Sequence, residues 1–189
     1  MKDLFRGRLV RLTSEEPETQ AKYEVRWQRD SEFRRLADSD PTDVSSEKKI
    51  KEQFEKRSED GFKPERYPFS IRTLNDDKLI GFIGLWVDLI HSEGWVGIGI
   101  GEREFWGKGF GTDAMELILQ YAFTELNLQR VSLALHSYNV RALKSYEKAG
   151  FRLEGTTRGD QRREGKRTDT FWMGILRDEW VQMQHGESK

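Results

Sequence analysis

The stretch Trp106-Gly107-Lys108-Gly109-Phe110-Gly111-Thr112 decides how this chain is interpreted. A strand-like run precedes it, and a periodic apolar run typical of a helix follows it. Glycines at alternate positions let successive backbone N–H groups point into one concavity, and the N-terminus of the following helix adds partial positive charge there. The stretch therefore predicts an anion-binding turn between a strand and a helix.

The segment before this turn, from Trp95 to Gly101, alternates glycine with apolar residues. One face of the predicted strand carries side chains, and the other face, at Gly97, Gly99 and Gly101, is bare backbone. Either a ligand or a large neighbouring side chain, such as a tryptophan, must cover that bare face.

A helix is predicted after the turn, because its apolar residues recur at helical spacing: Met115, Ile118, Leu119, Ala122, Phe123 and Leu126. Residues 131–135 then alternate as a second strand. Asn139 is placed to cap a second helix, which is expected to end at Ala149 with Gly150 in the left-handed position beyond it. Two strand–helix units in succession predict a parallel pair of strands.

The remaining segments predict antiparallel strands and further helices. Thr13 and Glu16 form a capping-box pattern that opens a helix in a mostly helical first third. Residues 69–88 predict a hairpin, and residues 151–176 predict another that turns near Glu164-Gly165. The sheet is therefore expected to be mixed, with ligands at the carboxyl ends of its strands, where the glycine turn lies.

Length and composition predict one domain spanning residues 1–189, since no linker or repeat divides the 189 residues. The formal net charge of -1 provides no basic field for nucleic acid or a membrane surface. The absence of cysteine excludes disulfides and thiolate catalysis, and three scattered histidines give no metal constellation. No apolar run reaches the roughly 18 residues of a membrane span, so we expect a cytoplasmic protein.

Two well-known phosphate motifs do not match the turn. A P-loop requires a Gly-Lys-Ser/Thr ending, whereas Lys108 is followed by Gly109. A dinucleotide fingerprint requires Gly-x-Gly-x-x-Gly, whereas the glycines here stand at 107, 109 and 111. Nucleoside triphosphate hydrolysis and NAD binding are therefore not indicated.

Two stretches resemble the core motifs of the GNAT superfamily of N-acetyltransferases. One is Ile100–Ala114, which contains the turn; the other is Asn139–Gly155, which reads Asn-Val-Arg-Ala-Leu-Lys-Ser-Tyr-Glu-Lys-Ala-Gly-Phe-Arg-Leu-Glu-Gly. The likeness extends more loosely to Arg8–Leu12 and to the closing hairpin with Asp169. The branch that it resembles contains the ribosomal-protein alanine and spermidine acetyltransferases. The resemblance implies an α/β (α+β) fold: a mixed, mostly antiparallel central sheet with helices on both faces and a central parallel strand pair.

The resemblance also implies acetyl-CoA as co-substrate and no metal. Its pyrophosphate would lie on the glycine turn, and its pantetheine arm along the strand before it. The implied cofactor-binding residues are Gly99, Ile100, Gly101, Trp106, Gly107, Lys108, Gly109, Phe110, Gly111, Thr112, Asn139 and Lys148. Relatives usually begin the turn with Gln or Arg, where this chain has Trp106. Lys108 also fits a solvated turn lysine, and Asn139 fits a helix cap alone.

Tyr146 matches the family's tyrosine that acts as general acid at the thioester sulfur. A phenol of pKa about 10 is a good hydrogen-bond donor to a departing thiolate, whose thiol has a pKa of about 8.5. The alternative is an ordinary packing tyrosine on an amphipathic helix.

The general base is less clear from the residues. Many relatives carry Glu at the position that aligns with Trp95, and this chain lacks it. Glu93, two residues earlier on the same face, Glu102 or a water chain are the candidate catalytic substitutes. His91 and His136 are weaker candidates.

The implied activity is transfer of an acetyl group to a primary amine, on a protein N-terminus or on a small amine such as a polyamine or antibiotic. A low-pKa α-amine needs a base least, which favours protein N-termini. A catalytically weak acyl-CoA-binding module and an RNA-binding adaptor using the basic run 158–167 are the alternatives from other classes; a solvated hairpin arm also explains that run. The resemblance further implies that two copies can form a homodimer.

Overall fold

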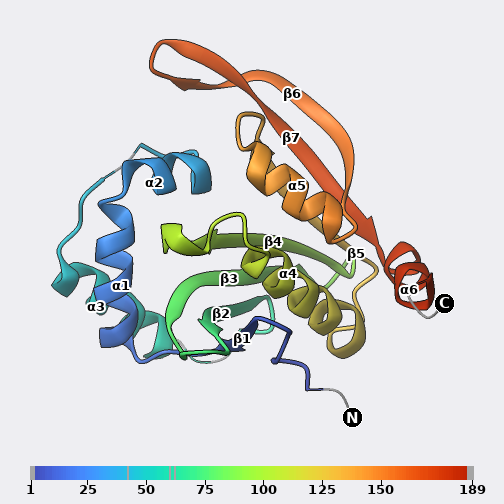
Figure 1. Cartoon of the computed structure of the whole chain (residues 1–189), viewed down its shortest axis with the longest axis horizontal. Coiled ribbons are helices and arrows are strands. Elements are labelled where there is room, and N and C mark those ends of the chain that lie inside the picture. Colours follow the sequence, from blue (N-terminus) through green and yellow to red (C-terminus); the bar gives the residue numbers. More distant parts are fainter. Residues whose placement is uncertain (1–2, 42, 60, 62, 187–189) are drawn as a thin grey trace.

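One sheet of seven strands organises the chain, in the order β1-β2-β3-β4-β5-β7-β6 (Figure 1). The computed structural model describes residues 3–41, 43–59, 61 and 63–186. The strands are β1 (Val10–Thr13), β2 (Arg66–Thr73), β3 (Leu79–Asp88), β4 (Glu93–Ile100), β5 (Arg130–His136), β6 (Arg152–Arg163) and β7 (Lys166–Leu176). All neighbours are antiparallel except the parallel pair β4–β5. The predicted mixed, mostly antiparallel sheet with one parallel pair is confirmed.

Helices cover both faces of this sheet, as predicted. They are α1 (Pro17–Gln28), α2 (Ser31–Ala37), α3 (Glu47–Glu59), α4 (Phe110–Gln120), α5 (Val140–Lys148) and α6 (Arg177–Gly186), with short turns η1 (Arg103–Phe105) and η2 (Tyr121–Glu125). On one face α4 and α5 pack over the main core (Figure 1). On the other face Trp27 of α1 and Phe33 of α2 pack against Phe82 of β3, with ring centroids 6.3 and 6.4 Å away.

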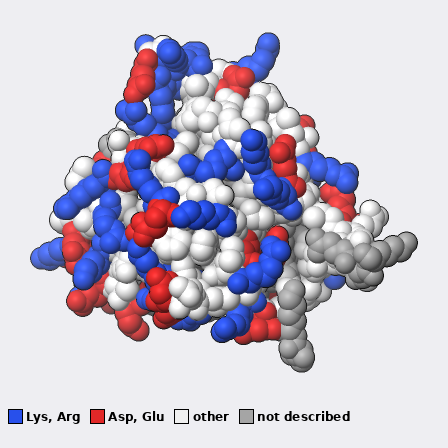
Figure 2. Space-filling view, viewed as in Figure 1, with Lys and Arg blue, Asp and Glu red and all other residues white. Residues whose placement is uncertain are grey.

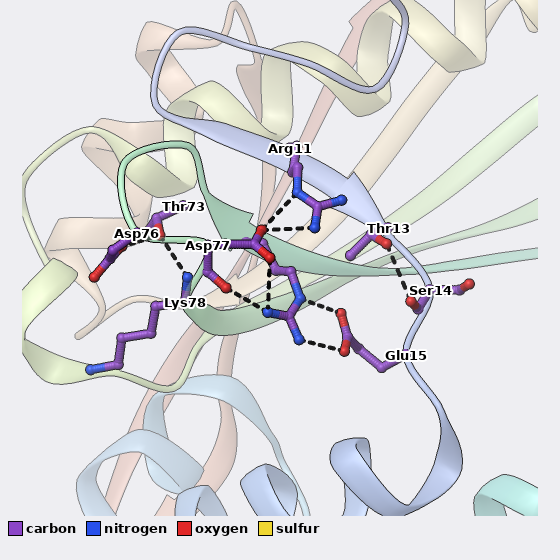
Figure 3. A network of polar contacts seen from close by, with 9 residues as sticks. Arg11, Thr13, Ser14, Glu15, Thr73, Asp76, Asp77 and Lys78 are labelled. Atoms are coloured by element: carbon purple, nitrogen blue, oxygen red, sulfur yellow. Dashed lines mark hydrogen bonds and ion pairs between the residues drawn. The ribbon is translucent and has the colours of Figure 1, made fainter.

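The connection between β1 and α1 differs from the prediction. Helix α1 begins at Pro17 after Glu16, whose side chain makes no capping bond, so the predicted capping box is wrong. The physical reason lies in Glu15, which accepts two bonds of 2.6 Å from the guanidinium of Arg72 on β2 and holds this segment extended. Figure 3 shows the network, in which Asp77 of the β2–β3 turn also joins Arg11 of β1. Strand pairing therefore decides where this helix starts.

The C-terminal helix α6 was not predicted from the sequence. Its Trp180 ring lies 5.4 Å from that of Phe123, beyond the end of α4. Gly150, after α5, takes a φ of +100° as expected, and the N–H of Phe151 donates to the carbonyl of Tyr146. The second strand–helix unit therefore ends as its sequence predicts.

Charged side chains of both signs are interspersed over the face drawn in Figure 2. Basic residues gather at the tip of the β6–β7 hairpin, and two of them serve the fold: Arg163 Nη2 donates to the carbonyls of Asp38 and Asp40, and Arg167 Nη1 donates to that of Gly159. These contacts join the hairpin to the segment after α2 and link its two strands. Within the described ranges, no helix has both the length and the apolar character needed to cross a membrane.

Candidate functional site

A cavity of about 640 Å³ opens where the two central strands separate. The parallel pairing of β4 and β5 ends at Trp95↔Ser132, although β4 continues to Ile100 and β5 to His136. Residues 96–100 of β4 and 134–136 of β5 line the cavity. The fork is therefore a built opening at the carboxyl ends of two parallel strands, where ligands bind in such sheets.

The edge of β4 that faces this fork carries backbone groups that no described strand pairs beyond Trp95. On its other edge, the N–H of Gly101 donates to the carbonyl of Ile80 (2.8 Å). Antiparallel alternation then directs the N–H groups of Ile100 and Ile98 toward the fork. The carbonyl of Ile100 follows the same pattern, because it accepts a 2.6 Å bond from the indole N–H of Trp106. Part of the strand edge is thus available to a ligand.

The glycine turn lies at the same opening. Gly107 and Gly109 adopt φ values of +71° and +90°, which L side chains rarely adopt. Gly109 is the N-cap of α4, and the first helical bond runs from Asp113 N–H to its carbonyl. The N–H groups of residues 110–112 therefore have no partner within the helix, and they carry the positive end of its dipole. An anion fits this position.

Cationic side chains of α5 stand beside the turn. Arg141, Lys144 and Lys148 line the cavity, and the Arg141 guanidinium lies 3.9 Å from the ring centroid of Trp106. Burial lowers the pKa of Arg141 from its ordinary value, although a guanidinium stays charged. Ser145 joins α5 to α4 through a 2.8 Å hydroxyl contact with Thr112. The cavity therefore has a cationic end suited to phosphates.

Tyr146 lies in the middle of this cavity wall, between the fork and the core. Its ring is 6.1 Å from that of Phe151, and its side chain also lines the cavity. Burial raises the pKa of Tyr146 to about 12. No residue that the structure describes forms a hydrogen bond with its hydroxyl. The phenol is thus a protonated donor at neutral pH, held by packing at the fork.

A family profile described as "Acetyltransferase (GNAT) domain" matches residues 7–152. The chain belongs to the GNAT acetyltransferase family. It is 31% identical to the probable N-acetyltransferase YjcK of Bacillus subtilis (strain 168), over 77% of this chain and 79% of that protein. It is 33% identical to the putative ribosomal N-acetyltransferase YdaF of the same strain, over 57% of this chain and only 58% of that protein. The recognised resemblance is confirmed, and the family places the chain among the acyltransferases.

The fold of this GNAT chain also matches solved structures. The spermidine N-acetyltransferase from Vibrio cholerae, in complex with CoA and spermine, superposes with a TM-score of 0.76 at 24% identity, over 91% of this chain and 98% of that one. At that identity the likeness concerns the fold.

Side chains of the chain itself pack on the bare face of β4. A Cβ at Gly99 would lie 2.8 Å from Phe82 and 3.0 Å from Phe33, and one at Gly101 would overlap Trp27. Large side chains cover these glycines, which was the second of the two predicted alternatives. In this GNAT domain the chain itself therefore fills the bare face of β4 at Gly99 and Gly101.

The structure brings most of the sequence-predicted cofactor residues together. The predicted residues that line the cavity, besides Tyr146, are Gly99, Ile100, Trp106, Gly107, Gly109, Gly111, Thr112, Asn139 and Lys148. Gly101, Lys108 and Phe110 are not among the lining residues. Gly101 faces Trp27, and Phe110 packs its ring edge-on against Phe105 at 4.9 Å.

The two predicted catalytic glutamates lie outside the cavity lining. Glu102 accepts bonds from Arg26 and from the indole of Trp27 (2.8 Å). Glu93 accepts a bond of 2.6 Å from Ser132 and one of 3.2 Å from Arg130. Their role as general base stays a prediction.

Two polar side chains lie at the far end of the cavity. The sequence indicated His136 only as a secondary candidate for the general base, and it did not indicate Thr170. His136 and Thr170 occupy paired positions on β5 and β7, and they are only 6% and 7% exposed. His136 Nδ1 and Thr170 Oγ1 have no partner among the described residues. Arg141, Lys144 and Ser145 also line the cavity unpredicted, although their spacing from Lys148 on one helix face was a usable signal.

Asn139 acts as a helix cap and as a clamp. Its Oδ1 accepts the N–H of Ala142 (3.2 Å), and its Nδ2 donates to the carbonyl of Leu36 in the last turn of α2 (3.2 Å). The predicted cap is confirmed. The end of α2 is thereby held at the cavity that His136 also lines.

Proposed function

We propose that this protein transfers the acetyl group of acetyl-CoA to a primary amine. The observation that carries the proposal is one cavity that joins the glycine turn, the free edge of β4 and Tyr146. Bound acetyl-CoA would supply the thioester carbonyl that the amine attacks. A protein N-terminus or a small amine fits this chemistry.

The residues of the fork fit the parts of acetyl-CoA in sequence. The unpartnered N–H groups at the start of α4, with Arg141, Lys144 and Lys148, would hold the phosphates. The pantetheine amides would pair with the free edge of β4, in the manner of an added strand. The N–H of Ile100 or Ile98 would then hydrogen-bond the thioester oxygen as it becomes negative.

Tyr146 completes the proposed chemistry. The neutral amine forms the new C–N bond, the C–S bond breaks, and the sulfur leaves as a thiolate that Tyr146 hydrogen-bonds. Because burial raises the pKa of Tyr146 to about 12, the hydroxyl keeps its proton while it donates. The excess proton of the new ammonium passes to water. An α-amine with a pKa near 8 supplies enough neutral amine for this route without a dedicated base.

The test is release of CoA thiol from acetyl-CoA by the purified protein, with and without peptide α-amines and small primary amines, alongside calorimetric binding of acetyl-CoA. We expect acceptor-dependent release together with binding. Binding without release for any amine would favour the acyl-CoA-binding module, and absence of binding would refute the proposed site.

A further inference from the structure

One half of a sheet face stays open beside the cavity. The bare face of β4 is covered by Trp27 and Phe33 only at its carboxyl end. Toward the other end, Trp86, Trp95 and Trp172 are 44%, 39% and 40% exposed. The strand register places all three on this face. Trp86 of β3 is the partner of Trp95 of β4, and Trp95 is the partner of Ser132 of β5. Ser132 is in turn the partner of Gly174 of β7, and Trp172, two residues before Gly174, points to the same side.

These three indoles, here called the tryptophan surface, lie next to one another on the sheet face. The ring centroids of Trp95 and Trp172 are 5.7 Å apart. The ring of Trp86 lies close to Gly84 and Gly97, since a Cβ at those positions would be 3.2 and 3.3 Å from it. The indole N–H of Trp172 donates to Thr157 Oγ1 (2.7 Å), which fixes that ring with its polar end satisfied. The surface therefore presents rigid, mainly apolar area.

The tryptophan surface begins where the cavity reaches this face. Gly97 and Ala134 line the cavity, and both lie on the same face as the indoles. Trp172 is the register partner of Ala134, and Trp86 approaches Gly97. The glycine turn and α5 occupy the opposite face. The tryptophan surface therefore borders the cavity through Gly97 and Ala134, and an acceptor amine that enters from this face passes the indoles.

Charge at this end disfavours a second cation on the acceptor. No Asp or Glu among the described residues lines the cavity. Of the carboxylates beyond the indoles, Glu93 and Glu154 are bonded to Arg130, and Asp88 accepts the backbone N–H groups of Ile90 and His91. A further ammonium group inside the cavity would lose water near Arg141, Lys144 and Lys148 without gaining a carboxylate in the lining, which is unfavourable.

The end wall of the cavity offers hydrogen-bonding groups on His136 and Thr170. The carbonyl of Asp38 lies 3.3 Å from His136 Nε2, and a carbonyl only accepts, so this nitrogen carries the proton. Nδ1 of the same ring and the hydroxyl of Thr170 are buried and have no partner among the described residues. Buried polar atoms without partners are costly, so this end is suited to a polar ligand group.

We propose that the tryptophan surface recognises the acceptor and selects primary amines on an apolar body with no second positive charge. This rests on the proposed function of the same site. The alternative for an aromatic floor, attraction of a cation to the indole faces, predicts the opposite preference.

The experiment compares hexylamine with 1,6-diaminohexane, which have the same chain length and differ in one terminal amine. CoA release should give a kcat/KM at least about tenfold higher for hexylamine. Trp172→Ala should lower that value at least about tenfold, chiefly through KM, while acetyl-CoA affinity stays unchanged; Trp172→Phe should restore most of it. Ile90→Ala, at an 88% exposed side chain outside the surface, is the control. Preference for the diamine would overturn the proposal.

A second readout does not depend on turnover. Hexylamine titrated into the CoA-loaded protein should shift the indole N–H resonances of Trp86, Trp95 and Trp172, assigned through single Trp→Phe variants, and leave that of Trp27 in place. Shifts without CoA release would sustain the recognition surface while the proposed reaction fails. CoA release without shifts would overturn the surface alone. Light scattering gives the third outcome. If the wild type has twice the mass of one chain, and Trp172→Ala has the mass of one chain with kcat/KM unchanged, the indoles form a dimer interface. That result would also overturn the proposed recognition surface.

Discussion

Among single residues, Tyr146 has an environment that suits a hydrogen-bond donor to the departing thiolate. Tyr146 lines the fork, and its hydroxyl has no hydrogen bond to any residue in the described part of the chain. Tyr146→Phe should lower kcat about 100-fold, since it removes only the donor to the thiolate. Acetyl-CoA affinity, measured by calorimetry, should change less than about twofold, because packing of the ring is retained.

The pH dependence follows from the same residue. Burial raises the pKa of Tyr146 to about 12, so its proton is retained as the pH rises. Between about pH 7 and 10 the neutral fraction of the amine grows, and kcat/KM should rise to a plateau without falling. A descending limb centred near pH 10 in the wild type, absent in Tyr146→Phe, would contradict the raised pKa.

At the element scale, helix α4 supports both the turn and the edge of the sheet. Asp113, in its first turn, is 2% exposed and accepts the backbone N–H groups of Arg8, Leu9 and Val10 at 3.0, 2.8 and 2.9 Å. This carboxylate ties the helix that begins at the glycine turn to β1. A fixed helix keeps its N–H groups in place before any anion arrives.

Asp113→Asn should lower the free energy of unfolding by about 3 kcal/mol, because an amide cannot accept on both sides and leaves buried N–H groups unpaired. Denaturant unfolding measures this loss. The matched control is Glu116→Gln, one turn later on a half-exposed side chain bonded to Arg8, which should cost less than about 0.5 kcal/mol. If both variants lower the free energy of unfolding by the same amount, the bonds from Asp113 to the backbone of β1 do not stabilise the fold as described.

At the scale of the whole molecule, segments far apart in the sequence close the acceptor end of the cavity. The β6–β7 hairpin extends toward α2 (Figure 1), where Glu164 pairs with Arg35 at 2.6 Å. Tyr138 donates to the carbonyl of Arg35 (2.6 Å), and Arg163 reaches the carbonyls after α2. Tyr138 and Arg163 thus hold α2 and the loop after it through donors to their backbone carbonyls.

Loosening this clamp should affect the acceptor and not the cofactor. Arg163→Gln should raise the acceptor KM about fivefold, the effect of losing roughly 1 kcal/mol of hydrogen bonding, and leave acetyl-CoA affinity unchanged. Arg162→Gln removes the same charge from an exposed neighbour and serves as control. Steady-state kinetics with hexylamine measure the two KM values. Equal KM values for Arg163→Gln and Arg162→Gln would contradict a role of Arg163 in holding the loop after α2.

The sequence was sufficient for features that depend on local patterns. Alternation, helical spacing and the glycine turn predicted the mixed sheet, the parallel pair and the ends of α5, and the GNAT resemblance supplied the site. Features that depend on long-range contacts escaped it. The start of α1 is set by Glu15 and Arg72, 57 positions apart, and the glycines of β4 are covered by Trp27 and Phe33. Likewise, nothing local reveals that Glu102 is engaged by Arg26 and Trp27.

In the proposed complex, acetyl-CoA lies in the β4–β5 fork, along the free edge of β4 and against the start of α4. Hydrogen–deuterium exchange with and without saturating acetyl-CoA tests this most directly. We expect slower exchange in residues 96–101 and 107–113, and no change in β2. Saturation by acetyl-CoA without protection of these two segments, or with protection confined to another part of the sheet, would contradict it.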